Sequence, residues 1–246
     1  MTAEAGTASD YGDLVRTHLD RVQRHNATAL ADVTELLLAC VRADGTVFTA
    51  GAGHSLAAVA ETFYRAGGLA CVQPLYHPEL LPMHGAMTST AAERRAGLAA
   101  EVLADTKPGS HDVLVVFSTS GVNPYPVELA GLAVQAGCPV VAVTSVAASA
   151  AAPRRAGSTL AENATHVLDN LVAPGDSAYP VDNPVTAALS SLANAFLWNL
   201  LLVRLVDRAA ELELALPLWR SSNVPGGDAA NAELMRRYQP RIPQLG

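Results

Sequence analysis

The sequence has very little lysine and no strong basic character. Of its 246 residues only Lys107 is a lysine, and the formal net charge is -7. Nucleic acid and anionic membrane surfaces both require a patch of basic side chains on the protein that binds them. The composition therefore argues against both partners, and it leaves open a small anion that a few local groups could hold.

Cysteine and long apolar runs are also scarce. The three cysteines are far apart and stand in apolar surroundings, which indicates buried free thiols rather than a disulfide framework or a metal site. The longest apolar stretch, 187–206, is too short for a membrane span because Asn194 and Asn199 interrupt it. Residues 1–13 are acidic and polar, unlike an export signal. We therefore expect a cytoplasmic protein without a membrane partner.

What the sequence does contain is an alternation of short apolar runs with segments of helical periodicity, which is typical of an α/β fold. Residues 14–41 predict one or two amphipathic helices. Strands are expected at 46–50, 69–75, 112–117, 139–145 and 165–171, and later helices at 56–65, 96–104, 124–135 and 184–212. We predict a doubly wound, mostly parallel five-stranded sheet flanked by helices, with N-terminal helices and a long C-terminal helix. One domain should span 1–246, with 1–13 and 220–246 peripheral.

Two glycine-bearing loops, "GAGHS" at 51–55 and "STSGVN" at 118–123, each follow a predicted strand. Ligands of an open parallel sheet bind outside the carboxyl ends of its strands. Gly51 and Gly53 permit close backbone approach, and Ser55 can cap the next helix. Asn123 can cap the later helix, with Pro124 at its first position. Each loop alone could be an ordinary turn, but together they favour an anion site.

Nucleotide-binding motifs are absent from both loops. Leu56 stands where a dinucleotide fingerprint needs its third glycine, and no acidic residue ends the second predicted strand. No Gly-Lys-Ser/Thr follows either loop, which excludes a nucleotide P-loop. The remaining possibility is a phosphate held by hydroxyls and backbone amides, with no lysine, metal or cofactor.

The loop "STSGVN" resembles the Ser-x-Ser-Gly-x-Ser/Thr phosphate loop of sugar isomerase (SIS) domains, and "GAGHS" resembles their earlier Gly-x-Gly-x-Ser loop. Within that family "SGVNPY" is most similar to the N-acetylmuramic acid 6-phosphate etherases. The resemblance covers about 14–212. Asn123 departs from the usual hydroxyl, so one phosphate hydrogen bond must come from an amide or be lost. The sugar-phosphate site implied by the resemblance comprises Gly51, Gly53, Ser55, Ser118, Thr119, Ser120, Gly121 and Asn123.

Enzymes of this superfamily mostly remove a carbon-bound proton beside a carbonyl, which needs a carboxylate or an imidazole. Glu61 follows the first loop, but Arg65 lies four residues later, so a solvated ion pair is as good an interpretation as catalysis. Glu93 stands at nearly the same distance before the serine loop as an acidic cluster in the etherases, in which a glutamate takes the C2 proton. Its alternative is a surface charge beside Arg94 and Arg95.

His54, inside the first loop, is placed to touch substrate or to act as an acid. His77 and His84 match no compact ligand spacing, so no metal is predicted. His18 and His25 share one face of the first helix, where subunit contacts, solvent or catalysis explain them equally. Side chains that could bind sugar hydroxyls, or could simply form turns, are Asp169, Asn170, Asp176, Asp182 and Asp228.

The function predicted is abstraction of the C2 proton of an N-acetylamino sugar 6-phosphate, of the N-acetylglucosamine 6-phosphate type, with elimination of water at C3. Glu93, Glu61 and His54 are the catalytic candidates. An aldose-ketose isomerase shares the first step and is the alternative. A non-catalytic sugar-phosphate sensor is the third possibility, although the chain has no spare basic DNA-binding segment. The resemblance also implies a homodimer or higher oligomer.

Overall fold

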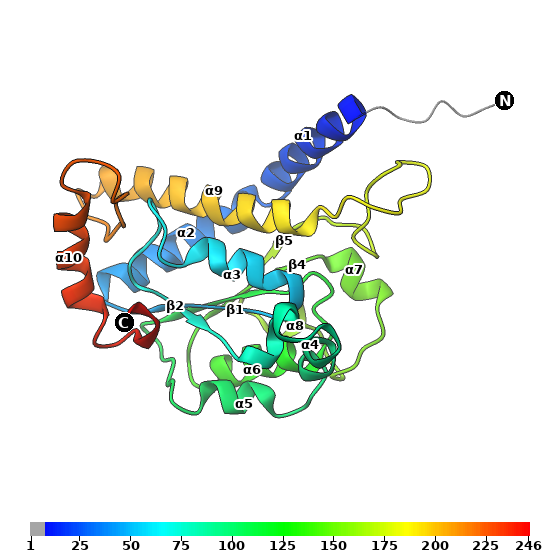
Figure 1. The fold of residues 1–246 in the computed structure, drawn as a ribbon, viewed down its shortest axis with the longest axis horizontal. Coiled ribbons are helices and arrows are strands. Elements are labelled where there is room, and N and C mark those ends of the chain that lie inside the picture. The colour runs from blue at the N-terminus through cyan, green and yellow to red at the C-terminus, as the bar shows by residue number, and fades with distance from the viewer. Residues whose placement is uncertain (1–7) are drawn as a thin grey trace.

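A computed structural model describes residues 8–246, and a single parallel sheet lies at its centre (Figure 1). The strand order is β2-β1-β3-β4-β5, and every neighbouring pair is parallel. The predicted five-stranded α/β fold is therefore confirmed. The strands are β1 (Val47–Gly51), β2 (Val72–Leu75), β3 (Val113–Phe117), β4 (Val140–Thr144) and β5 (His166–Asp169).

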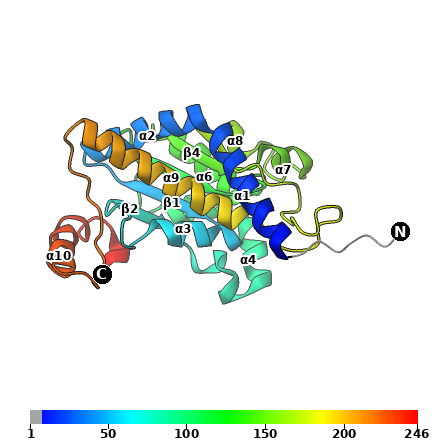
Figure 2. The same cartoon turned by 90° about the horizontal axis from the view of Figure 1, so that it is seen from above.

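Helices cover both faces of the sheet, which is why its central strands are buried along their whole length. On one face α2 and α3 pack against the strands and α9 crosses over them; on the other lie α5, α6 and α8 (Figures 1 and 2). The α-helices are α1 (Ala8–His25), α2 (Ala27–Arg42), α3 (Leu56–Thr62), α4 (Ala86–Glu93), α5 (Leu98–Leu103), α6 (Pro124–Gln135), α7 (Val146–Ala151), α8 (Leu160–Asn163), α9 (Ser190–Glu211) and α10 (Gly227–Tyr238). Short 3-10 segments are η1 (Gly53–Ser55), η2 (Pro78–Leu80), η3 (Pro82–His84) and η4 (Pro243–Leu245).

The register of the central strands brings the two glycine loops together. Gly51, the last residue of β1, is paired with Phe117, the last residue of β3. Because parallel strands in register end at the same level, the loop that leaves β1 and the loop that leaves β3 begin side by side. Both then turn into helices, α3 and α6, on opposite faces of the sheet.

The long C-terminal helix begins six residues later than expected, at Ser190 instead of at 184. Residues between β5 and α9 form an irregular excursion with an antiparallel bridge between Tyr179 and Thr186. Ala187 has a positive φ of 63°, which no α-helix tolerates. The helical periodicity of the sequence extends through this segment. The left-handed backbone of Ala187 nevertheless prevents the helix from starting before it.

The C-terminal segment 220–246 was expected to be peripheral, and it is better integrated than that. It contains α10, and Tyr238, Ile242 and Leu245 belong to the buried core cluster. These apolar residues are sparse among polar ones, so no periodic pattern indicated their burial. Of the N-terminal segment 1–13, residues 1–7 lie outside the described residues, and 8–13 are the start of α1, which projects from the body (Figure 1).

The three cysteines are buried and free, as predicted. Burial raises the pKa of each thiol, to about 11 at Cys71 and about 12 at Cys138, and also at Cys40. A thiol that stays protonated at neutral pH is a poor nucleophile. Within residues 8–246, no helix has the length and apolarity needed to cross a bilayer.

Candidate active site

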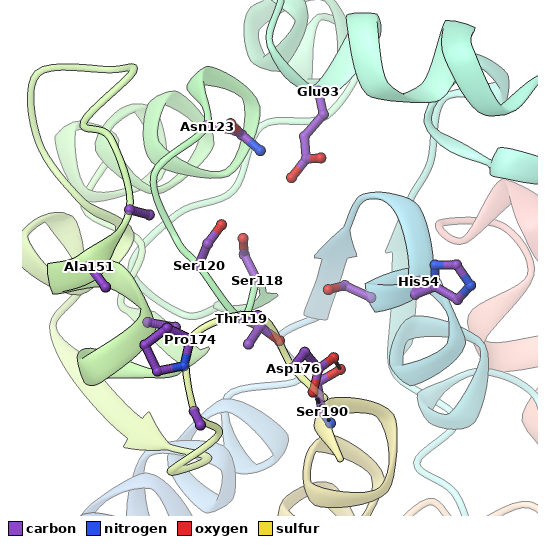
Figure 3. Close-up of a pocket in the computed structure, with 15 residues that line it drawn as sticks. His54, Glu93, Ser118, Thr119, Ser120, Asn123, Ala151, Pro174, Asp176 and Ser190 are labelled. Carbon is purple, nitrogen blue, oxygen red and sulfur yellow. Dashed lines mark hydrogen bonds between the residues drawn. The ribbon is translucent and has the colours of Figure 1, made fainter. Parts of the chain in front are cut away.

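The two glycine loops line a cavity of about 430 Å³ at the carboxyl ends of the strands (Figure 3). The first loop contributes His54 and Ser55, and the second contributes 118–120 and Asn123. Glu93 enters from the end of α4, and α7 with the residue after it, the loop after β5 and the start of α9 form the remaining walls. A cavity of a few hundred Å³ with a few convergent polar groups suits a small polar ligand.

Glycine is required at both ends of the first turn. Gly53 has a positive φ of 58°, a conformation that costs a residue with a Cβ about 1–2 kcal/mol. At Gly51 an added Cβ would lie 3.1 Å from backbone atoms of Ser55. The turn can be this tight because Gly51 and Gly53 carry no Cβ. It brings Ser55 to the cavity. His54 lies at the rim, and its ring is turned away from the serine loop (Figure 3).

The serine loop is just as tightly constrained. Gly121 has a positive φ of 58°, and its N–H donates to Ser118 Oγ at 3.2 Å. A Cβ on Gly121 would lie 2.9 Å from Thr144 Oγ1 and 3.2 Å from Leu160 Cβ. Only glycine fits between β4 and α8 at this point.

Hydrogen bonds from the body of the protein hold the loop's carbonyl groups. Ser145 N–H donates to Thr119 O at 2.9 Å, and Ser149 Oγ donates to Ser120 O at 2.6 Å. These bonds fix the backbone of the loop and use none of its side-chain hydroxyls. Ser118 and Ser120 point into it in Figure 3.

Asn123 precedes α6 as expected, but its side chain does not cap the helix. Instead Asn123 Oδ1 accepts a hydrogen bond from Arg155 Nη1 at 3.1 Å. Arg155 follows α7 and is 32 residues away along the chain, so no local pattern pointed to this pair. It is the contact at the site that sequence reasoning missed.

Glu93 is the last residue of α4, and its carboxylate points toward the serine loop (Figure 3). The expected alternative was a surface charge paired with its arginine neighbours. Arg95 binds Glu79 and Glu101 instead, at 3.3 and 3.1 Å. Among residues 8–246, no hydrogen bond or ion pair engages the Glu93 carboxylate, so it is available to a ligand.

Glu61 lies elsewhere, between α3 and α9, and does not line the cavity. It forms the expected ion pair with Arg65, and Asn199 Nδ2 donates to its Oε1 at 3.0 Å. Burial raises the pKa of Glu61, but the hydrogen bonds from Asn199 and Arg65 outweigh burial and leave the pKa below its usual value. A carboxylate held in its charged form by two donors is a weak base.

Asp176 contributes to the cavity wall by a structural contact. Its Oδ1 accepts from the N–H groups of Leu189 and Ser190 at 3.1 and 3.0 Å, and its Oδ2 accepts from Ser190 Oγ at 2.5 Å. These bonds satisfy the first free N–H groups of α9. The carboxylate therefore occupies the end of α9 that faces the cavity.

The other acidic and amide candidates lie outside the cavity. Asp169 Oδ1 accepts from Leu171 N–H at 2.9 Å, and Asn170 Nδ2 donates to Asn194 Oδ1 at 2.9 Å. Asp182 is exposed on the excursion before α9. Asp228 is in the first turn of α10, at the opposite end of the molecule from α4 and α7 (Figure 1).

Three further histidines have structural surroundings. His18 is buried and its Nε2 bonds to Asn170 O at 2.9 Å. His25 Nε2 lies 3.9 Å from Asp169 Oδ2. His77 Nδ1 lies 3.8 Å from Glu79 Oε2 and accepts from Glu79 N–H. Across residues 8–246, no three His, Cys, Asp or Glu side chains come close enough to hold a metal ion.

Residues 10–145 match the family described as SIS domain. The chain belongs to the SIS-domain family. Curated relatives match this SIS-domain chain over nearly its whole length. A UPF0309 protein of Brucella anthropi is 35% identical and one of Streptomyces avermitilis 34%, with 96% and 98% of this chain and 97% and 98% of the relatives covered.

Solved structures confirm the SIS-type fold. The phosphoheptose isomerase of Neisseria gonorrhoeae has a TM-score of 0.52 and 18% identity, covering 78% of this chain and 94% of that one. The sugar isomerase domain of an RpiR transcription factor from Sphaerobacter thermophilus has a TM-score of 0.51 and 18% identity, covering 91% and 95%. These similarities concern the fold.

Proposed function

We propose that this SIS-domain protein is a cytoplasmic enzyme that removes the C2 proton of an N-acetylamino sugar 6-phosphate and eliminates water at C3. The observation that carries the proposal is the position of Glu93. Its unpaired carboxylate points into the cavity across from the hydroxyls of Ser118 and Ser120 (Figure 3). A phosphate on the serine loop would leave the sugar carbons extending toward this carboxylate.

The reaction needs a base and a proton donor but no cofactor. In the open-chain aldehyde, the C2 hydrogen is acidic because the C1 carbonyl delocalises the electron pair left behind. Glu93 takes that proton, a double bond forms between C2 and C3, and the C3–O bond breaks. The departing hydroxyl takes a proton, from His54 after side-chain rotation or from the Glu93 carboxyl, and leaves as water. The substrate loses one proton and one hydroxyl, so no oxidant is required.

An aldose-ketose isomerase is the second candidate, and similarity to phosphoheptose isomerase structures favours it. It would start with the same deprotonation at C2, on a sugar phosphate with a C2 hydroxyl. The proton would then return at C1 of the enediol to give a ketose. The two reactions therefore share the phosphate site and the base, and they separate only after the first intermediate.

The deciding experiment is incubation of the purified protein in heavy water with N-acetylglucosamine 6-phosphate, and in parallel with glucose 6-phosphate. Mass spectrometry and proton NMR would follow the products. Loss of one water from the amino sugar supports the lyase. A ketose phosphate with deuterium at C1 supports the isomerase. Binding of either sugar phosphate without exchange or product would overturn both and leave a sensor.

We also propose that the protein is a homodimer or a higher oligomer. Apolar side chains at helical spacing are exposed along α9, among them Leu192, Val203 and Val206. Large exposed apolar patches are typical of interaction surfaces. Light scattering after size-exclusion chromatography should give at least twice the mass of 25.5 kDa, and a monomer at micromolar concentration would contradict this.

A further inference from the structure

The cavity is acidic for a site that is proposed to hold a dianion. Glu93 and Asp176 both line it, and neither lysine nor arginine is among its lining residues. The whole chain has a net charge of -7. A phosphate bound only by neutral hydroxyls would be repelled by the two carboxylates that line the same cavity. The site needs a cation to offset them.

Two of the helix ends at the cavity, those of α6 and α9, provide little of that compensation. Pro124 and Pro126 occupy the first and third positions of α6, so two of its three first N–H donors are missing. The corresponding donors of α9 are already bonded to Asp176. An anion in this cavity therefore receives less help from these two helix termini than the α/β architecture usually gives.

Arg155 is the cation within reach of the site. Its guanidinium donates to Asn123 Oδ1 at 3.1 Å, and Asn123 is 7% exposed and lines the cavity. Within the described residues, Arg155 has no carboxylate partner, whereas its neighbour Arg154 is bound to Glu162 at 2.7 Å. A positive charge that has no carboxylate partner beside an acidic cavity can bind an anionic ligand.

The amide of Asn123 has a defined orientation. A guanidinium has donors only, so the atom that meets Arg155 must be the amide oxygen. The amide nitrogen is then directed into the cavity, on the side of Glu93 and Ser120 (Figure 3). Asn123 thereby supplies a donor to the cavity where SIS domains usually have a hydroxyl, and it holds a cation as well.

We propose that Arg155 is the cationic contact of the bound phosphate and that Asn123 is the positioning residue that directs its guanidinium to the serine loop. This inference rests on the proposed sugar-phosphate function and deepens it. The departure from the usual serine or threonine at position 123 is then a specificity feature. It exchanges one hydroxyl for an amide plus a positive charge, and it selects phosphorylated over unphosphorylated sugars.

The test is calorimetric titration of the full chain with three probes: N-acetylglucosamine 6-phosphate, inorganic phosphate and unphosphorylated N-acetylglucosamine. Loss of a charge-assisted hydrogen bond in R155Q should weaken both phosphate probes by about 10- to 100-fold. R155K, which keeps the charge but not the two-pronged donor geometry, should be intermediate. R154Q is the matched control, because it removes an adjacent arginine that is engaged with Glu162.

The role of Asn123 is isolated by a double-mutant cycle. N123S supplies the hydroxyl of the usual SIS pattern but releases Arg155. It should weaken phosphate binding by about 3- to 10-fold in the wild-type background and by less than about twofold in R155Q, because coupled residues are not additive. Equal effects in both backgrounds would show that Asn123 does not act through Arg155 and would overturn its positioning role. Thermal unfolding identifies any variant that is simply misfolded.

The outcomes separate the two levels of the proposal. If the wild-type protein binds neither phosphate probe, the proposed function fails and this inference fails with it. If the wild-type protein binds them and R155Q binds as tightly as R154Q, the proposed function stands and only the inference is overturned. Equal loss of affinity for the unphosphorylated sugar in R155Q would also overturn it, since the contact is assigned to the phosphate.

Discussion

Asp176 binds Ser190 twice, through the Ser190 backbone N–H at 3.0 Å and through its hydroxyl at 2.5 Å. The pair joins the loop after β5 to the first turn of α9, and both residues line the cavity. The contact that holds the start of α9 therefore also holds one wall of the candidate active site.

Asp176→Ala should accordingly lower both stability and ligand affinity. Loss of a carboxylate that caps two backbone donors at the start of α9 should reduce the free energy of unfolding by about 1–2 kcal/mol. Asp182→Ala in the same excursion, where the side chain is exposed, should change it by less than about 0.5 kcal/mol. Urea denaturation measures both. Equal stability of the two variants would contradict the capping role.

The serine loop should not tolerate a side chain at Gly121. Gly121→Ala combines a positive φ of 58° with a contact of 2.9 Å to Thr144 Oγ1. Gly137→Ala is a matched control, because Gly137 has a φ of 81° but open space around its Cβ position. The control should cost about 1–2 kcal/mol from the left-handed backbone alone. Gly121→Ala should cost about 1–3 kcal/mol more, from overpacking, and should weaken phosphate binding, which Gly137→Ala should leave unchanged.

Two glutamates that the sequence left equivalent should differ sharply in activity. Glu93→Gln keeps the shape of the side chain but removes the base, so C2 proton exchange with heavy water should slow by about 10²- to 10⁴-fold. Glu61→Gln alters a carboxylate that is already bound by Arg65 and Asn199 outside the cavity. Its exchange rate should stay within about threefold of wild type. Proton NMR at C2 reports both, and full exchange in Glu93→Gln would end the assignment of the base.

Stability should fall in mild acid because of His18. Burial lowers the pKa of this imidazole from 6.5, although the hydrogen bond to Asn170 O partly opposes the shift. The unfolded chain therefore binds the proton first as the pH falls below 6.5, and the folded state loses stability between that value and the lower folded pKa. One group can contribute a slope of at most about 1.4 kcal/mol per pH unit.

Urea midpoints between pH 7.5 and 5 would measure that slope. His18→Gln should make it shallower, whereas His111→Gln, which changes an exposed histidine, should preserve the wild-type slope. A wild-type midpoint that rises as the pH falls would have the wrong sign for a histidine with a lowered pKa.

The fold was predictable because apolar periodicity reflects the physics that determines it. Strands buried on both faces must be continuous apolar runs, as in Val113–Phe117, and such runs are visible in a single sequence. The two glycine loops were predictable for a similar reason, since positive φ and close backbone approach leave few alternatives to glycine. The beginning of α9 was not, because its limit depends on the positive φ of Ala187 and on the carboxylate of Asp176, 14 residues before Ser190.

The sequence by itself determined the parallel sheet, the two glycine loops, the buried thiols and the SIS-type resemblance, all of which depend on local pattern. Only the tertiary structure distinguished Glu93 from Glu61 and paired Arg155 with Asn123. Which side chains share a cavity depends on where strands end and helices cross. Asn123 and Arg155, 32 positions apart, are brought into contact by that geometry. No periodicity along the chain predicts this contact.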